Sequence, residues 1–255
     1  MKTAEVVIRV TLFYLLISIA VLILSPLGPY IAYLAIIGLS LAFVVISRIT
    51  FRLGNPLPGL IAGSLAILAV FMIVLGAGGV IVNGLNTNNI PAILVWGFIL
   101  QIFVVLGEEL SFRQYIFADL ERATGTAPAA VVSALGFAAM HIPSIISLGT
   151  APTEAIIALA TISIAGIVLA ILFVKAGLFA AAGFHFAWNF LQYSVLGLGN
   201  MSSALDVTKT GSDLLNGGTF GPEASIPGLI VIGAVLVSIW YIYGKPRLKT
   251  QHMNS

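Results

Sequence analysis

The chain alternates long apolar segments with short polar ones along almost its whole length. Eight of the apolar segments contain at least about 17 residues, which is enough to cross a hydrocarbon core of roughly 30 Å as a helix. They lie at about 10–26, 28–47, 58–82, 90–117, 128–149, 152–174, 176–197 and 226–243. This pattern predicts an all-α, polytopic membrane protein in which residues 1–255 form a single integral membrane domain.

The composition supports a protein that resides in the lipid bilayer. Of the 255 residues, 60% are hydrophobic and only 8% are charged, so no segment is left that could form a soluble domain. The sequence contains no cysteine, which excludes disulfides, a thiol nucleophile and a cysteine metal site. Because the basic residues are scattered between apolar segments, we expect no nucleic-acid partner.

The distribution of basic residues predicts the orientation in the membrane. Lys and Arg accumulate in cytoplasmic loops, and the eight spans bring nearly all of these residues to one side. The side defined in this way holds Lys2, Arg9, Arg48, Arg52, Arg122, Lys175, Lys245, Arg247 and Lys249. Only Lys209 lies opposite, together with residues 83–89 and the polar loop 198–225. We therefore expect a cell-membrane protein with both termini in the cytoplasm.

Polar side chains inside the spans are the candidates for function. An ionisable residue at mid-membrane costs about 2.5 to 3.5 kcal/mol on insertion scales, and such residues commonly mark a functional site. The ionisable residues that lie deep in the spans are Glu108, Glu109, Arg113, His141 and His185. Asn189 is the strongest neutral polar residue that accompanies them. Counted from the side rich in Arg, Glu108, His141 and His185 lie roughly 14, 20 and 14 Å deep. If their helices are neighbours, these groups converge on one water-accessible cavity.

Helical spacing suggests how the side chains are arranged. Glu109 and Arg113 are four residues apart, so they share a face and favour an ion pair. Glu108 is turned by about 100° from Glu109 and can face a different partner. His185 and Asn189 are also four apart, which places an imidazole beside a carboxamide. Hydrolysis of a peptide bond needs a base that activates water and donors that stabilise the developing oxyanion, and these residues supply both.

Three segments of the sequence resemble the motifs of the CPBP family of intramembrane proteases. GEELSFRQYIF contains Glu-Glu-x-x-x-Arg, GFAAMH contains Phe137-x-x-x-His141, and HFAWNF contains His185-x-x-x-Asn189. All three occur in the family's order and inside predicted spans, and the resemblance covers about residues 100–197. The family includes the type II CAAX prenyl endopeptidases and prokaryotic relatives linked to bacteriocin self-immunity.

The resemblance implies a fold of eight helices with a cytoplasm-facing cavity. It implies that Glu108 and His141 activate water, and that His185 and Asn189 stabilise the oxyanion. Glu109 and Arg113 would organise the site or bind the substrate. The expected substrate is a peptide or lipidated protein in the membrane, for which a prenylated CAAX-type C-terminus is a candidate. No cofactor is expected.

Other interpretations of the same residues stay open. Two histidines and a glutamate can bind catalytic zinc, in which case Glu108, His141 and His185 are the ligands and Glu109 is the base. The signature His-Glu-x-x-His is absent, which favours a reaction without a metal. A catalytically silent immunity or scaffold protein would keep the same fold. A proton-coupled transporter is disfavoured, because the outer halves of the spans hold almost no ionisable groups.

Overall fold

The computed structural model of the protein describes residues 3–244. In this part of the chain, seven helical segments are long and apolar enough to cross a membrane. They are Thr3–Leu27, Pro29–Ile46, Leu57–Gly76, Ile90–Thr124, Thr126–Ser147, Pro152–Ala176 and Ile226–Tyr243. The protein is therefore an all-α, polytopic membrane protein, as the hydrophobic pattern predicted.

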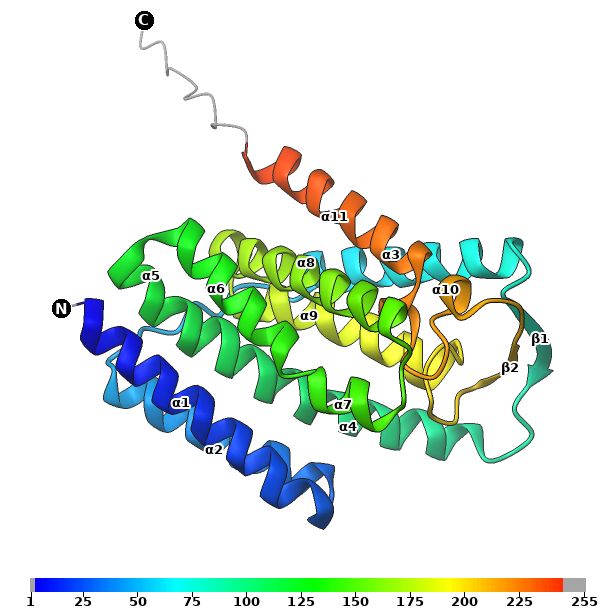
Figure 1. Ribbon diagram of the computed structural model, residues 1–255, viewed down its shortest axis with the longest axis horizontal. Helices are drawn as coiled ribbons and strands as arrows, with labels where there is room; N and C mark the ends of the chain where they lie inside the picture. Colours follow the sequence, from blue (N-terminus) through cyan, green and yellow to red (C-terminus); the bar gives the residue numbers. More distant parts are fainter. Residues whose placement is uncertain (1–2, 245–255) are drawn as a thin grey trace, which may run out of the picture.

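The helices form a bundle that a small sheet closes at one end (Figure 1). The α-helices are α1 (Thr3–Leu24), α2 (Pro29–Ile46), α3 (Leu57–Gly76), α4 (Ile90–Glu109), α5 (Ala118–Thr124), α6 (Thr126–Ala139), α7 (Ile142–Ser147), α8 (Pro152–Ala176), α9 (Leu178–Phe190), α10 (Asp213–Asn216) and α11 (Ile226–Gly244). The shorter elements are the 3-10 helices η1 (Ser25–Leu27) and η4 (Pro222–Ala224), the π-helices η2 (Leu110–Phe117) and η3 (Leu191–Val195), and the strands β1 (Val80–Leu85) and β2 (Leu205–Lys209).

Two of the helices that carry the polar motifs change their winding, α4 within its motif and α9 just beyond it. Helix α4 continues without a break into η2 and then α5, and α9 continues into η3. A π-helix is rare and is often found at a functional site, because its wider turn redirects the side chains that follow. Here η2 begins directly after Glu109, and η3 begins two residues after Asn189.

Several predicted span boundaries differ from the structure. The third span was predicted to end at 82, but α3 ends at Gly76, and the turn that follows includes Gly78 at φ +74°, a conformation that favours glycine. The fourth span was predicted to end at 117, whereas the continuous helix reaches Thr124. The fifth is broken, since α6 ends at Ala139 and a turn separates it from α7.

The predicted seventh span, at 176–197, corresponds to α9 and η3. It is not among the seven long apolar segments, because α9 itself has only 13 residues. Helix α9 lies at the centre of the bundle, against α3 on one side and α8 on the other. Gly59 and Gly63 of α3 are four residues apart, and a Cβ atom added at either would collide with the α9 backbone. Small residues at this spacing allow two membrane helices to approach closely.

The sheet joins two segments that the sequence placed on the same side of the membrane. Strand β1 pairs with β2 in antiparallel register, with Val80 opposite Lys209 and Leu85 opposite Leu205. We call this end of the bundle the sheet end (Figure 1). The strands themselves were not predicted, because β1 overlaps the predicted third span and β2 lies in the segment that was predicted as a polar loop.

The opposite end of the bundle holds the arginines and is called the arginine end. Arg9 forms an ion pair of 2.9 Å with Asp119, and Arg52 forms one of 2.8 Å with Glu121. Arg122 donates to the backbone oxygens of Ser47 and Arg48. The predicted grouping of these arginines at one end is thus observed, while their cytoplasmic location stays a prediction. Lys2, Lys245, Arg247 and Lys249 lie outside the described residues.

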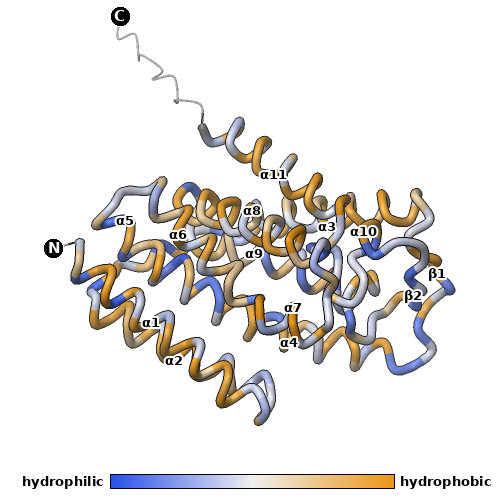
Figure 2. The backbone as a smooth tube through the Cα atoms, in the orientation of Figure 1, coloured by the Kyte–Doolittle hydropathy of each residue, from blue (hydrophilic) through white to orange (hydrophobic). Residues whose placement is uncertain are grey.

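The surface of the long helices is suited to lipid. Apolar residues cover the bundle, and the hydrophilic ones gather near its two ends and in its interior (Figure 2). Large hydrophobic side chains are exposed on α1 and α2, including Leu22 and Val45. A water-soluble protein rarely exposes contiguous apolar surface of this extent.

Candidate functional site

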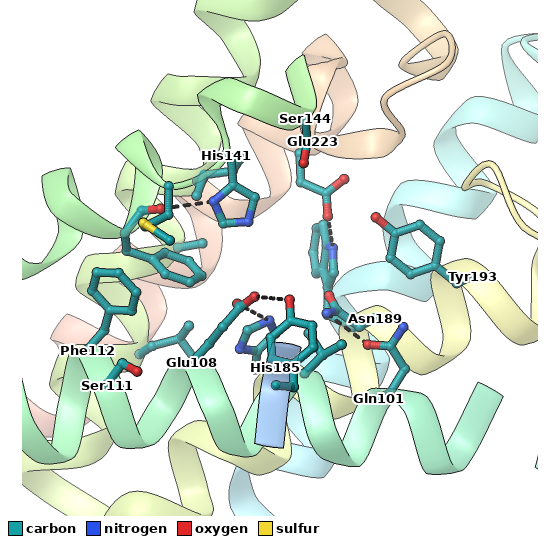
Figure 3. A pocket seen from close by; sticks show the side chains of 18 of the residues that line it. Gln101, Glu108, Ser111, Phe112, His141, Ser144, His185, Asn189, Tyr193 and Glu223 are labelled. Atoms are coloured by element: carbon teal, nitrogen blue, oxygen red, sulfur yellow. Dashed lines mark hydrogen bonds and ion pairs between the residues drawn. The ribbon is translucent and has the colours of Figure 1, made fainter. Parts of the chain in front are cut away.

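A cavity of about 400 Å³ lies within the bundle. Residues from α1, α2, α4, α6, α8 and α9 line it, as do residues from the segment between η3 and α11 (Figure 3). All of the residues predicted to be catalytic contribute to the lining, namely Glu108, His141, His185 and Asn189. The helices that carry these residues are therefore neighbours, which the sequence argument had assumed.

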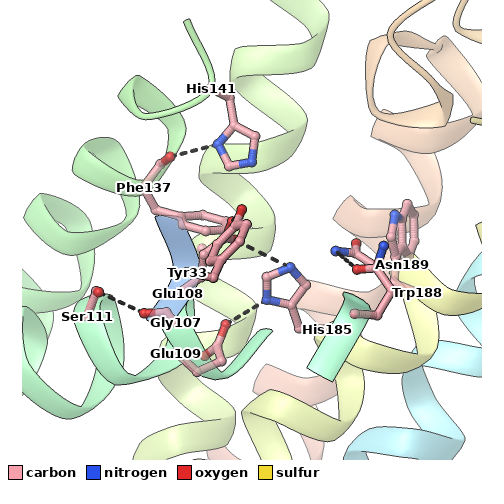
Figure 4. Close-up of polar contacts among 12 residues, drawn as sticks. Tyr33, Gly107, Glu108, Glu109, Ser111, Phe137, His141, His185, Trp188 and Asn189 are labelled. Atoms are coloured by element: carbon pink, nitrogen blue, oxygen red, sulfur yellow. Dashed lines mark hydrogen bonds and ion pairs between the residues drawn. The ribbon is translucent and has the colours of Figure 1, made fainter. Parts of the chain in front are cut away.

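Glu108 is held at the cavity by contacts from two other helices. Its Oε1 atom accepts a hydrogen bond of 2.9 Å from the hydroxyl of Tyr33 in α2, and its Oε2 atom lies 3.6 Å from Nε2 of His185 in α9 (Figure 4). The sequence did not identify Tyr33, because an aromatic residue in an apolar span normally indicates packing. The two contacts fix the carboxylate of Glu108 while leaving it part of the cavity wall.

Glu109 and Arg113 form the predicted ion pair, but they lie behind the wall of the cavity. Nη1 of Arg113 donates to Oε1 of Glu109 at 3.1 Å, and the two side chains are 1% and 0% exposed. The same Oε1 atom accepts from Nδ1 of His185 at 2.8 Å. Neither residue is part of the cavity lining. In this structure the pair orients His185, and its predicted contact with substrate stays a prediction.

His141 is placed in the turn between α6 and α7, with one ring nitrogen fixed by the backbone. Its Nδ1 atom lies 2.9 Å from the carbonyl oxygen of Phe137. Because a carbonyl oxygen can only accept, Nδ1 carries the proton, and Nε2 of the neutral ring is left as an acceptor. The ring of Phe137 packs edge-on against His141 and His185, at centroid distances of 5.0 and 5.9 Å.

Asn189 joins α9 to α4 and also lines the cavity. Its Nδ2 atom donates a hydrogen bond of 3.1 Å to Oε1 of Gln101. Gln101 is buried and lines the cavity as well. The sequence argument overlooked Gln101 because it considered mainly ionisable residues. This bond connects two helices, and the place of Asn189 on the cavity wall allows it a second role.

Glu223 is a cavity residue that sequence reasoning missed. It lies in η4, and its carboxylate accepts hydrogen bonds from Nε1 of Trp188 at 2.7 Å and from Nε2 of Gln192 at 3.0 Å. Burial raises the pKa of the Glu223 carboxyl, whereas these hydrogen bonds act in the opposite direction because they stabilise the carboxylate. Glu223 could not be recognised from hydrophobic periodicity, because it lies in the three-residue helix η4 and outside the long apolar helices.

The cavity extends toward the sheet end. Its lining includes Asn200, Met201 and Phe220 from the segment after α9, and among residues 3–244 no Lys or Arg contributes to it. The sequence predicted a cavity that faces the arginine end. The difference arises because the helix that carries Glu108 continues to Thr124, so this carboxylate lies near the middle of a segment of 35 residues. At the arginine end, buried aromatic rings pack against one another instead.

The arrangement does not fit a zinc site of three protein ligands. Among the described residues, no group of three or more His, Cys, Asp or Glu side chains could hold a metal ion. Nδ1 of His185 is bonded to Glu109 and Nδ1 of His141 to a backbone carbonyl, and the remaining donor atoms of Glu108, His141 and His185 do not form a ligand set. We therefore describe no step through a metal, and the absence of a cofactor stays a prediction.

Membrane helices that gather carboxylate, imidazole and carboxamide groups around an internal cavity provide what an intramembrane hydrolase requires. Residues 90–191 match the family described as type II CAAX prenyl endopeptidase Rce1-like. This segment, which runs from the start of α4 to the start of η3 and makes up less than half of the chain, is therefore similar to the Rce1-like family. Neither the curated proteins nor the solved structures include a significant match.

Proposed function

We propose that this protein is an endopeptidase that hydrolyses a peptide bond of a membrane-anchored substrate inside the cavity. The observation that supports this most strongly is the presence of Glu108, His141, His185 and Asn189 on the wall of one cavity. The substrate is a peptide or a lipidated protein, for which a prenylated CAAX-type C-terminus is the first candidate. The reaction needs no metal.

In the proposed first step, a water molecule binds between Glu108 and His141. The carboxylate of Glu108 and Nε2 of His141 are both acceptors at the cavity, so together they orient the water. The Glu108 carboxylate takes one proton from the water. The oxygen then attacks the carbonyl carbon of the substrate, and the electron pair of the C=O bond moves to its oxygen.

In the proposed second step, His185 and Asn189 stabilise the oxyanion. Because Nδ1 of His185 donates to Glu109, Nε2 can donate only when the ring carries both protons. The Nδ2 group of Asn189 has a second hydrogen beyond the one used by Gln101. When the intermediate collapses, the C–N bond breaks and the leaving nitrogen takes the proton held by Glu108, which restores the carboxylate.

Replacing Asn189 by alanine is expected to lower kcat by about 10²- to 10³-fold, the usual effect of removing one oxyanion donor. KM should change little, because the donor acts mainly on the charge of the transition state. Steady-state cleavage of a fluorogenic peptide by the purified variant in detergent measures both constants. Asn83→Ala is the matched control, since Asn83 is exposed in β1. A raised KM with unchanged kcat would assign Asn189 to substrate binding instead.

Cleavage is expected to survive removal of divalent metals. The test incubates the purified protein with a strong chelator, removes the chelator by gel filtration, and then measures metal content and cleavage. Unchanged activity in metal-free protein is the expected result. Loss of activity that zinc restores would contradict the proposed mechanism and would assign Glu108, His141 and His185 to a metal.

The function itself is tested with a fluorogenic peptide that ends in a prenylated CAAX sequence. Purified protein in detergent should cleave this peptide, and the same peptide without the prenyl group shows whether the lipid is required. If well-folded protein cleaves neither peptide nor any member of a wider peptide library, the proposal fails. The silent immunity or scaffold interpretation would then be favoured.

A further inference from the structure

Glu223 has no part in the mechanism above, although its carboxylate faces the cavity. It lies between β2 and α11, outside the residues that match the family. Figure 3 shows it on the other side of the cavity from Glu108, near His141. Since Glu223 lines the same cavity as Glu108, a substrate bound beside Glu108 would also come close to this second carboxylate.

The carboxylate of Glu223 is oriented before any ligand binds. Trp188 and Gln192 each donate a hydrogen bond to a different oxygen, and the Trp188 ring stacks on Phe184 at an interplanar angle of 17°. Gln192 is completely buried. A group that is already fixed loses little conformational entropy when it binds a ligand, which favours a role in recognition.

The carboxylate of Glu223 has acceptor capacity and, among the described residues, no ion-pair partner, although His141 and Lys209 act on it electrostatically. A carboxylate offers about four lone-pair sites, and Trp188 and Gln192 use two of them. Among residues 3–244, no Lys or Arg forms an ion pair with Glu223. Lys209 is near enough to interact electrostatically, but its ammonium group donates to the carbonyl oxygen of Gly218 and is not part of the cavity wall.

A cation supplied by the substrate would balance this charge. A buried carboxylate without a partner is costly, and a charge-assisted hydrogen bond from an ammonium or guanidinium group offsets the cost. Among the described residues, two glutamates, Glu108 and Glu223, and no Lys or Arg line the cavity, and most of the other lining residues are apolar. This combination fits a peptide that has apolar side chains and one positive charge.

We propose that Glu223 is a specificity-determining residue that binds a positively charged group of the substrate, a Lys or Arg side chain or an amine, close to the scissile bond. The inference rests on the proposed proteolytic function and names the class of substrate for the same cavity. It makes Glu223 a recognition residue, distinct from the groups that activate water or stabilise the oxyanion.

The test measures binding of a labelled peptide series to the Glu108→Gln protein by fluorescence anisotropy. Each peptide carries either lysine or uncharged norleucine at one position around the expected scissile bond. The Glu108→Gln substitution prevents cleavage and also removes the carboxylate of Glu108 from the cavity. At one position the lysine peptide should bind about tenfold more tightly than the norleucine peptide. In the Glu108→Gln/Glu223→Gln double variant this difference should disappear.

Two comparisons separate recognition from a structural role. Glutamine at position 223 keeps the size of the side chain, and Gln192 can turn its amide to preserve a hydrogen bond, so the thermal unfolding temperature should be retained. If Glu223 merely supports α9, the lysine and norleucine peptides lose affinity equally. Trp188→Phe removes one hydrogen bond but leaves the carboxylate in place, and it should keep a preference for lysine.

Equal binding of lysine and norleucine peptides at every position would overturn the inference, and so would a preference that survives Glu223→Gln or a failure to bind any peptide. Cleavage of the same peptides by the unsubstituted protein is measured in parallel. Binding with a preference for lysine but without cleavage would defeat the proposed protease function alone. Cleavage without any preference would defeat the assignment of Glu223 alone.

Discussion

Replacing Glu108 by glutamine is expected to lower the rate of peptide cleavage by about 10²- to 10⁴-fold, the usual contribution of a general base. Glutamine has nearly the same size and can still accept the hydrogen bond from Tyr33, but it cannot take a proton from water. The variant should therefore stay folded and inserted. Cleavage of the fluorogenic prenylated peptide and thermal unfolding in the same detergent measure the two properties.

Glu121→Gln is the matched control for this variant. Glu121 is a glutamate at the arginine end, where it pairs with Arg52, and it is not part of the cavity wall. Its replacement should leave the cleavage rate within a factor of about two, because surface pairs of this kind contribute little. Full activity in Glu108→Gln would remove Glu108 from the mechanism.

Removing the carboxylate of Glu109 is expected to destabilise the protein by about 3 to 5 kcal/mol, because it leaves the buried charge of Arg113 unpaired. Glu109→Met is the appropriate variant, since methionine has a similar volume. The free energy of unfolding in mixed micelles measures the effect. The variant should also lose activity, because His185 loses the carboxylate that orients its ring.

A double variant and a second ion pair serve as controls. Glu109→Met combined with Arg113→Met should be more stable than Glu109→Met alone, since an apolar pair leaves no uncompensated charge. Arg52→Met breaks the exposed pair with Glu121 and should cost only about 0.2 to 1 kcal/mol. If Glu109→Met and the double variant had the same free energy of unfolding, the charge of Arg113 would not require Glu109 for its stabilisation.

The core of the site could be predicted from the sequence because it rests on local rules. Ionisable residues are rare in apolar spans, so Glu108, His141 and His185 are conspicuous among their neighbours. The spacing of four residues between Glu109 and Arg113 correctly predicted their contact, because helix geometry alone brings them together. The placement of the arginines at one end of the bundle likewise follows from the number of spans that precede each arginine in the sequence.

The remaining features depend on contacts between distant segments. Tyr33 and Gln101 are neutral residues in apolar helices, and only the packing of α2, α4 and α9 gives them polar partners in the cavity. Glu223 reaches the wall through a loop whose path no periodicity encodes. The π-helices were also missed, since the hydrophobic pattern does not distinguish them from α-helix. Tyr33, Gln101 and Glu223 change the predicted composition of the cavity. The continuation of the Glu108 helix to Thr124 changes the predicted direction of the cavity.

The pairing of β1 with β2 determines when the cavity wall becomes complete during synthesis. Strand β1 precedes α4, whereas its partner follows η3, so all the helices that carry motif residues are made before the sheet can form. Closing a loop of this length is a slow, non-local step. A nascent chain that has only reached α9 already contains the motif residues but lacks the segment that carries Glu223. The wall at the sheet end can therefore be completed only after the helices that carry the motif residues have been synthesised.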